Sequence, residues 1–322
     1  MHPRPCAPRP CVHAPWQDAA APAQPPPART RPHRCYDVAM TELELPNVAF
    51  DRVIDRALEE DLAAGDVTTE ACIDATTLAT AHAMARQDLV VCGGPVFARV
   101  FARIDPDVRF ESFAKDGESV LRGTKLWTVR GLARTILMGE RVALNLAQRM
   151  SGVATLTRAH VDAVPRGTGT RITDTRKTTP GLRALERYAV RAGGGKNHRD
   201  NLGSAVLIKD NHIAACGGVK VAIERARAHA THTSRIECEV DTLEQLDVAL
   251  AARADIVLLD NMDAPTVAEA VRRARGKALT EASGGVTLAR IADLARAGVD
   301  YISVGALTHS APAVDIGLDF EP

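Results

Sequence analysis

The chain has 322 residues, of which 46% are hydrophobic and 25% are charged, as is ordinary for a globular protein with a full core. The formal net charge is zero, so composition does not indicate a nucleic acid or a membrane surface as the partner. Aromatic residues make up only 3%, which argues against the stacking platforms that bind single-stranded nucleic acid.

The seven cysteines show no paired spacing, no CxxC motif and no grouping with histidines that would indicate a metal site. Reduced thiols of this kind are typical of a cytoplasmic protein. The N-terminus lacks the apolar core of a secretory signal, and no apolar run reaches the length of about 18 residues that a membrane span needs.

Residues 1–39 differ from the rest of the chain in composition. More than half of the eighteen prolines lie in the first 32 residues, together with several arginines and few aliphatic side chains. Such a segment buries too little apolar surface to offset the entropy of ordering, so we expect a disordered extension. Met40 opens "MTELELPN", which is typical of a protein start.

Residues 40–150 predict a first domain of helices and an antiparallel sheet. The spacing of apolar residues predicts a helix over 47–64, followed by a turn at "GDVTTE". Short strand-like runs separated by glycines follow between residues 79 and 130. Residues 132–164 read as helices that break near Ser151 and Gly152.

Residues 151–310 predict a second domain, in which strands and helices alternate along the chain. Apolar strand-like runs, from "TRITDT" to "DYISVGAL", alternate with helices near 181–192, 217–230, 242–252, 264–275 and 287–297. Alternating strands and helices with short loops predict a parallel sheet with right-handed crossovers, as in an α/β barrel. We expect the tail, residues 311–322, to pack back on the first domain.

Nearly every predicted barrel strand ends in polar residues. The strand ends carry Asp174, Arg176 and Lys177, then Lys209 and Asp210, Glu239 and Asp241, Asp260 and Asn261, and Glu281. The carboxyl ends of barrel strands converge on one face, where ligands bind, so this repetition predicts a shared site.

Glycine loops and a cluster of cations indicate anionic ligands for that site. "ASGGV" (282–286) and "SVGAL" (303–307) each follow a strand and open a helix, where backbone N–H groups bind phosphate. "DTRKTTPGL" (174–182) and "GGGKNHRDNL" (193–202) bring arginines, lysines and a histidine, which suit carboxylates. Glu239 and Asp260 would then hold Mg²⁺ beside phosphate oxygens, hold ribose hydroxyls, or stabilise a cation.

Ordered motifs over residues 44–320 resemble the quinolinate phosphoribosyltransferase family. They include "GDVTT" (65–69), "GERVALN" (139–145), "DTRKTTPGLRALERYAVRAGGGKNHRDNL" (174–202), "LIKDNH" (207–212), "LLDN" (258–261), "EASGG" (281–285) and "VGALTHS" (304–310). The resemblance implies an N-terminal α/β sandwich domain, a C-terminal open (incomplete) α/β barrel of TIM-like type, and a homodimer whose sites are completed by the neighbouring subunit.

The resemblance also implies the reaction and its residues. Quinolinate and phosphoribosyl pyrophosphate would give nicotinate mononucleotide, pyrophosphate and CO₂ with Mg²⁺, a step of NAD biosynthesis. The implied catalytic residues are Lys177, Lys209, Glu239 and Asp260, and the last two are the implied magnesium ligands. The implied substrate-binding residues are Arg141 from the partner subunit, Thr175, Arg176, Lys177, His198, Arg199, Lys209, Glu239, Asp260, Ser283, Gly284, Gly285, Gly305 and Ala306.

Three alternatives remain open from the sequence. One is a related phosphoribosyltransferase for another aromatic carboxylate, such as the paralogue linked to molybdate uptake. Another is a class I aldolase with Lys209 as the Schiff-base lysine. The last is a non-enzymatic polyanion binder that uses the basic segment 1–39.

Overall fold

The computed structural model describes residues 45–321, so the expectation for residues 1–39 lies outside the described part. The N-terminal region contains a four-stranded antiparallel sheet in the order β12-β1-β5-β3 and a small ribbon of β2 and β4. Its strands are β1 (Leu78–Ala85), β2 (Leu89–Val90), β3 (Arg109–Ser112), β4 (Ser119–Val120), β5 (Lys125–Leu132) and β12 (Ile316–Phe320). Its helices are η1 (Asn47–Ala49), α1 (Asp51–Leu62), α2 (Val67–Cys72), α3 (Gly94–Ile104) and the first half of α4 (Ala133–Asp162).

An aromatic cluster fills the core between this sheet and its helices. The ring of Phe97 on α3 lies 4.8 Å from that of Trp127 on β5 and 5.2 Å from that of Phe101, between ring centroids. All three side chains are fully buried. Buried residues alternate with partly exposed ones along β1, which gives the sheet one buried face, and the 3.6-residue period of α3 presents its apolar side to that face.

Two local predictions for this region are wrong. The segment "GDVTTE" contains helix α2 rather than only a turn, because the Asp66 side chain accepts a hydrogen bond from the Thr69 N–H at 2.9 Å and caps the helix. Helix α3 also interrupts the run of strands between residues 79 and 130.

The predicted break near Ser151 and Gly152 is also wrong, because α4 is one continuous helix of 30 residues. Gly152 serves a different purpose, since a Cβ atom there would collide with the carbonyl oxygen of Pro312. The glycine therefore allows the C-terminal segment to cross closely over the helix. After this crossing, β12 pairs antiparallel with β1, so the end of the chain completes the first sheet.

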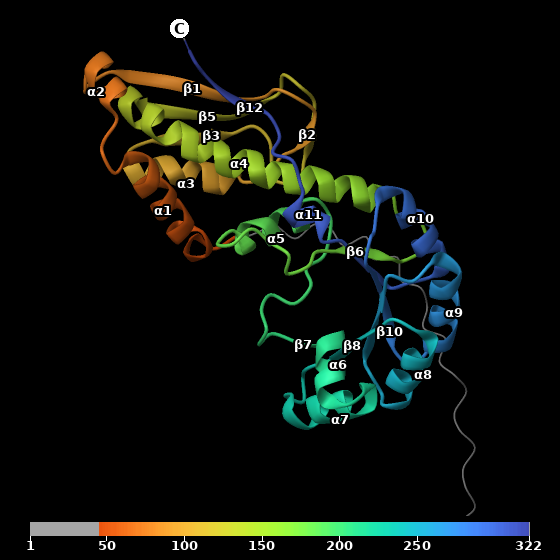
Figure 1. Cartoon of the computed structure of the whole chain (residues 1–322). Helices are drawn as coiled ribbons and strands as arrows, with labels where there is room; N and C mark the ends of the chain where they lie inside the picture. Colours follow the sequence, from red (N-terminus) through yellow and green to blue (C-terminus); the bar gives the residue numbers. More distant parts are fainter. Residues whose placement is uncertain (1–44, 322) are drawn as a thin grey trace, which may run out of the picture. The chain divides into compact units, whose positions relative to one another are not determined.

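The second region is a six-stranded parallel sheet in the order β6-β11-β10-β9-β8-β7, as expected for an open barrel. Its strands are β6 (Arg171–Thr173), β7 (Val206–Ile208), β8 (Ile236–Val240), β9 (Ile256–Asp260), β10 (Leu279–Ser283) and β11 (Tyr301–Ser303). Its helices are α5 (Arg183–Ala192), α6 (Asp210–Cys216), α7 (Val219–His229), α8 (Leu243–Ala251), α9 (Ala264–Ala274), α10 (Leu288–Ala297) and α11 (Ala306–His309). Figure 1 shows α8, α9 and α10 following one another along the outside of the strands.

Helix α4 connects the two regions. It contacts β1, β5 and β12 of the first sheet, and it also contacts α5, β6, α10 and α11 of the barrel (Figure 1). Arg149 near its middle forms an ion pair with the fully buried Glu186 of α5 at 2.7 Å and donates to the Ala311 carbonyl at 2.6 Å. Among the described helices, none has both the length and the hydropathy of a membrane span.

Candidate active site

A cavity of about 540 Å³ opens at the carboxyl ends of the barrel strands. It is lined by Thr175, Arg176, Lys177, His198, Arg199, Leu207, Lys209, Glu239, Leu258, Asp260, Asn261, Glu281, Ser283, Gly284, Gly285 and Ser303. Strand pairing puts Glu239, Leu258 and Glu281 in one row across β8, β9 and β10, so their side chains share the inner face. The predicted convergence of polar strand ends is thus present in the fold.

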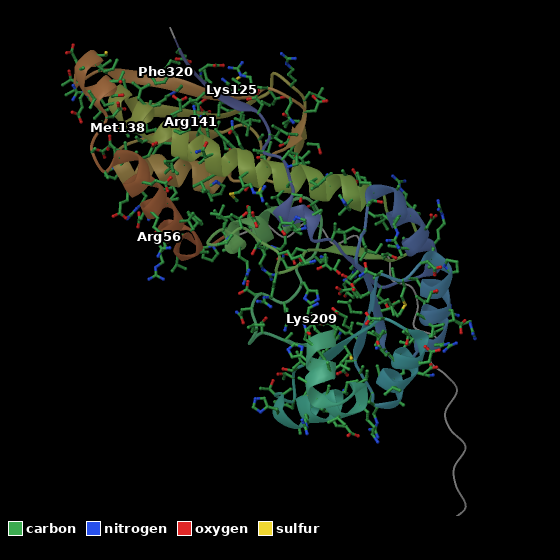
Figure 2. The ribbon with its side chains drawn as sticks, viewed as in Figure 1. Arg56, Lys125, Met138, Arg141, Lys209 and Phe320 are labelled. Carbon is green, nitrogen blue, oxygen red and sulfur yellow. The ribbon has the colours of Figure 1, made fainter. Side chains whose placement is uncertain are left out.

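Three predicted site residues do not line this cavity. Gly305 lies next to it, because a Cβ atom there would be 3.1 Å from Cδ of Lys177, and Ala306 begins the short helix α11. Arg141 is exposed on α4, whereas Lys209 immediately precedes α6 in the barrel (Figure 2).

Asp174 joins the two cation-rich loops. Its fully buried carboxylate accepts hydrogen bonds from the backbone N–H of His198 and from the side-chain amide of Asn197, both at 2.6 Å. Arg187 of α5 lies 3.6 Å away. Burial raises the pKa of Asp174, against the opposing effect of these partners. The loop from 174 to 182 is thereby fixed to the loop from 193 to 202.

Three arginines of α5, between these two loops, hold the fold rather than line the cavity. Arg187 donates to the carbonyl oxygen of His198 at 2.8 Å, and Arg191 donates to the Asn197 side chain at 2.9 Å. Arg183 donates to the Thr178 hydroxyl at 3.0 Å. The sequence alone could not distinguish these structural arginines from the cavity-lining Arg176 and Arg199, because the direction of each side chain depends on how α5 packs.

Arg176 and Arg199 are the cations whose surroundings favour an anionic ligand. The Nε atom of Arg176 is buried and has no hydrogen-bond partner among the described residues. Burial lowers the pKa of Arg199, and the positive charge of Arg176 lowers it further. Two guanidinium groups that repel each other beside a cavity gain most from a carboxylate that accepts from both.

Both ring nitrogens of His198 have protein partners. Nδ1 accepts from the backbone N–H of Arg199 at 2.7 Å, and Nε2 lies 3.3 Å from Glu237 and 3.5 Å from Glu281. Burial lowers the pKa of His198, but hydrogen bonds and charges of these glutamates raise it to about 10. This raised pKa favours the imidazolium, whereas the contact with the Arg199 N–H needs an acceptor atom, which only a neutral ring with its proton on Nε2 offers.

Lys209, Glu239 and Asp260 form a further group of charged side chains in the cavity. The Lys209 ammonium lies 2.5 Å from Glu239, and the Lys209 backbone N–H donates to Nδ1 of His212 at 2.9 Å, which gives His212 a structural contact. The pKa of Asp260 is raised, first by burial and then by the charges of Glu239 and Asp241, while Lys209 and Lys177 lower it. Neighbouring carboxylates that repel one another suit a divalent cation.

The loop after β10 offers backbone donors. Gly284 and Gly285 have φ angles of +84° and +55°, and a Cβ atom on Gly284 would collide with the side chain of Asn261. Arg290 donates to the carbonyl oxygens of Gly285 at 3.2 Å and Met262 at 3.0 Å. The N–H and C=O groups of one trans peptide point in opposite directions. In the two peptides whose carbonyls accept from Arg290, the N–H group therefore points away from Arg290. Such donors at a helix N-terminus suit phosphate.

Some cavity residues are not among the predicted site residues. Leu207, Leu258 and Ser303 belong to the inner face of strands, and a strict period-2 reading of each strand would have found them. Glu281 was noted only as a strand end. Asn261 was noted in the same way, and its φ of +54° is visible only in the structure.

Comparison with known proteins agrees with this geometry. Residues 66–151 match the N-terminal domain of quinolinate phosphoribosyl transferase, and residues 153–319 match its C-terminal domain. The chain is 47% identical over 284 residues to nicotinate-nucleotide pyrophosphorylase [carboxylating] of Mycobacterium leprae, which covers 85% of this chain and 99% of that one. It is 41% identical over 273 residues to the probable enzyme of that name from Bacillus subtilis, covering 85% and 94% of the two chains.

The fold is also similar to solved structures of proteins with this name. The structure of the nicotinate-nucleotide pyrophosphorylase from Francisella tularensis superposes with a TM-score of 0.83 at 37% identity, covering 87% of this chain and 99% of that one. The ranges matched by the family span both regions, and the residues that line the cavity lie within residues 153–319. The chain therefore belongs to the quinolinate phosphoribosyl transferase family.

Proposed function

We propose that this protein transfers the phosphoribosyl group of phosphoribosyl pyrophosphate to quinolinate, with decarboxylation, to give nicotinate mononucleotide, pyrophosphate and CO₂. The observation that carries the proposal is the pair of adjacent guanidinium groups, Arg176 and Arg199, in a cavity that also contains a phosphate-type glycine loop. Quinolinate carries two adjacent carboxylates, and the co-substrate carries a phosphate and a pyrophosphate. A cavity for both needs cations on more than one side.

In this proposal, quinolinate binds at the two cation-rich loops. Arg176 and Arg199 hold its carboxylates, Thr175 and Lys209 lie on the same wall, and His198 supports Arg199 through its backbone contact. Bidentate contacts would fix the plane of the ring, which determines where its nitrogen points.

The phosphoribosyl donor binds on the other side of the cavity. Ser283, Gly284 and Gly285 offer hydroxyl and backbone donors to the 5′-phosphate, and Gly305 and Ala306 flank the neighbouring loop. Lys177 lies against Gly305, and with Lys209 it is positioned to neutralise the pyrophosphate.

Glu239 and Asp260 fit a magnesium ion. Both carry oxygen donors on the cavity wall, and burial, followed by the negative charge of Glu239, raises the pKa of Asp260. Magnesium bound there would offset charge on the pyrophosphate. The same two acids can accept hydrogen bonds from the ribose hydroxyls.

The chemistry follows from these positions. As pyrophosphate leaves C1 of the ribose, positive charge develops on the sugar ring, and the nearby carboxylates of Glu239 and Asp260 stabilise it. The quinolinate nitrogen then attacks C1. The resulting positively charged ring accepts the electron pair of the bond that breaks when the 2-carboxylate departs as CO₂.

We also propose a cytoplasmic homodimer in which Arg141 reaches the site of the partner subunit. The exposure of Arg141 on α4, away from its own cavity, is consistent with this role. Mixing Arg141→Ala and Lys209→Ala variants tests it, because one site of a mixed dimer regains both residues. Activity of the mixture near that of the separate variants would contradict a shared site.

The reaction is tested by incubating the protein with quinolinate, phosphoribosyl pyrophosphate and Mg²⁺ while nicotinate mononucleotide is measured by chromatography. Nicotinate, which lacks the second carboxylate, serves as the parallel substrate. Product from quinolinate alone is expected. No product from quinolinate would refute the substrate assignment. Borohydride trapping of Lys209 with a carbonyl substrate would instead support an aldolase.

A further inference from the structure

Two buried side chains, Glu186 of α5 and Thr308 of α11, hold the loop 174–182 at two points. The Glu186 carboxylate accepts from the Thr179 N–H at 3.0 Å and from the Thr179 hydroxyl at 2.7 Å. The Thr308 hydroxyl donates to the carbonyl oxygen of Lys177 at 2.9 Å. Glu186 and Thr308 are fully buried and do not line the cavity, whereas Lys177 does. These two contacts are the anchors of the loop.

Arg149 of α4 joins the two anchors. Its guanidinium lies 2.7 Å from the Glu186 carboxylate and also donates to the carbonyl oxygen of Thr308. Helix α11 contacts both α4 and α5, so Arg149 acts where these three helices meet (Figure 1). The loop after β6 and the helix after β11 are therefore held to each other and to α4.

The side chain of Lys177 is constrained by the same part of the chain. A Cβ atom on Gly305 would be 3.1 Å from Cδ of Lys177, so the lysine passes closely over the glycine. The Thr308 hydroxyl lies 3.3 Å from the Gly305 carbonyl oxygen. Residues 305–308 thus contact both the backbone and the side chain of Lys177, and they set its direction at the cavity.

Stability alone does not account for the buried carboxylate of Glu186. An ion pair in a protein interior contributes little net stability, because the cost of removing both charges from water offsets their attraction. Apolar side chains of similar volume often stabilise such a position equally well. They could not accept from the N–H and the hydroxyl of Thr179, and those are the bonds that fix the loop.

We propose that Thr308 and Glu186 are positioning residues, which orient Lys177 toward the pyrophosphate of the phosphoribosyl donor by fixing the loop backbone. This inference rests on the proposed function. Lys177 is exposed, and a lysine side chain is long and flexible, so its ammonium group is placed only as well as the backbone that carries it. A displacement of about 1 Å in such a group can lower a rate about a hundredfold.

Thr308→Val tests the first anchor, because valine has nearly the shape of threonine and lacks the hydroxyl. We expect kcat/KM for phosphoribosyl pyrophosphate to fall about tenfold in steady-state kinetics. The Kd of quinolinate, measured by calorimetry, should stay close to the wild-type value, because Asp174 still holds the start of the loop. Thr308→Ser, which restores the hydroxyl, should recover most of the loss.

Thr179→Val tests the second anchor. It removes the hydroxyl bond to Glu186 and keeps the N–H bond, so we expect a smaller loss in the same direction. Amide hydrogen exchange of the protein without substrate gives a second measurement. Exchange over residues 174–182 should be faster in Thr308→Val than in the wild type, since the loop has lost a contact.

Thr170→Val is the matched control. Thr170 is also buried, and its hydroxyl donates to the carbonyl oxygen of Val299 at 2.7 Å, just before β6 and at the end of that strand away from the cavity. Because each variant loses one buried hydrogen bond, both should lower the melting temperature by a few degrees. Only Thr308→Val should change the kinetics and the exchange over residues 174–182.

Equal values of kcat/KM in Thr308→Val and Thr170→Val would overturn the inference. Unchanged exchange over residues 174–182 in Thr308→Val would overturn it as well, and so would a kinetic loss that Thr308→Ser does not reduce. These outcomes apply to a wild-type protein that is active. A wild-type protein that makes no nicotinate mononucleotide from quinolinate would refute the proposed function, and this inference with it.

Discussion

The two regions of the molecule bury different kinds of side chain. In the N-terminal region, the largest buried side chains are aromatic or aliphatic, and among residues 45–132 the buried polar residues are Thr69 and Thr128. In the barrel, by contrast, the described residues include five buried carboxylates: Asp174, Glu186, Glu237, Glu239 and Glu281. Apolar burial stabilises a fold by itself, whereas a buried charge needs a partner.

The difference separates stability from function. The aromatic cluster around Phe97 needs no ligand, and it gives the sheet a rigid core on which α4 lies. The barrel also contains an incompletely paired cation at the cavity, since Nε of Arg176 has no hydrogen-bond partner among the described residues. In the barrel, positive charge at the cavity therefore lacks a full set of protein partners, and an anionic substrate can supply the missing ones.

The largest effect that would test this comparison is loss of a cavity cation. Arg176→Ala should lower kcat/KM for quinolinate about a thousandfold, equivalent to roughly 4 kcal/mol, because it removes a partly buried guanidinium that lines the cavity. Steady-state kinetics with each substrate varied in turn should place the loss on quinolinate rather than on phosphoribosyl pyrophosphate. The melting temperature should change little.

Arg296→Ala is the control for this experiment, because Arg296 is exposed on α10, lies outside the cavity and pairs with Asp293. An equal loss for both substrates would contradict the assignment of Arg176 to quinolinate.

A substitution in the core of the first region should lower stability and leave kcat nearly unchanged. Phe97→Ala should destabilise the fold by about 3–5 kcal/mol, since it leaves a cavity between Phe101 and Trp127. Denaturant unfolding measures the loss. At a temperature where the variant remains folded, kcat should stay near the wild-type value, and a large fall in kcat there would show that the two regions are coupled.

The ion pair between the regions should give an intermediate effect. Arg149→Met leaves Glu186 buried without its cation and should cost about 2–3 kcal/mol, somewhat less than a fully buried pair because Arg149 is 22% exposed. Adding Glu186→Gln should recover part of this stability. If the double variant is no more stable than the single one, the cost comes from the lost carbonyl contacts of Arg149 instead.

The smallest effect belongs to a surface pair of the first region. Arg99 donates to both oxygens of Asp51 at 2.9 Å, and this hydrogen bond lowers the pKa of Asp51. A lowered folded-state pKa means that the contribution is present above the unfolded-state pKa and is lost as pH falls through the folded-state value. Asp51→Asn should therefore cost less than about 1 kcal/mol at pH 7, and the difference should vanish in strong acid. A difference that grows in acid would contradict this sign.

Several features of the site could be predicted because they depend on local order along the chain. Asp260 follows "IVLL" and Lys209 follows "VLI", and in a parallel sheet the ends of such strands must meet at one edge. The break at Gly152 was predicted wrongly for the converse reason. In its local sequence a glycine predicts a break in the helix, but here the glycine makes room for Pro312, which lies 160 positions later in the chain.

The sequence by itself determined the alternation of strands and helices, the polar strand ends and the glycine loop at 283–285, because periodicity and turn chemistry act over a few residues. Only the tertiary structure decided which arginines line the cavity and which, like Arg187, hold loop carbonyls. It also placed Glu237 and Glu281 at 3.3 and 3.5 Å from Nε2 of His198. Those outcomes depend on the stagger of neighbouring strands and the packing of α5, which bring together side chains from distant parts of the chain.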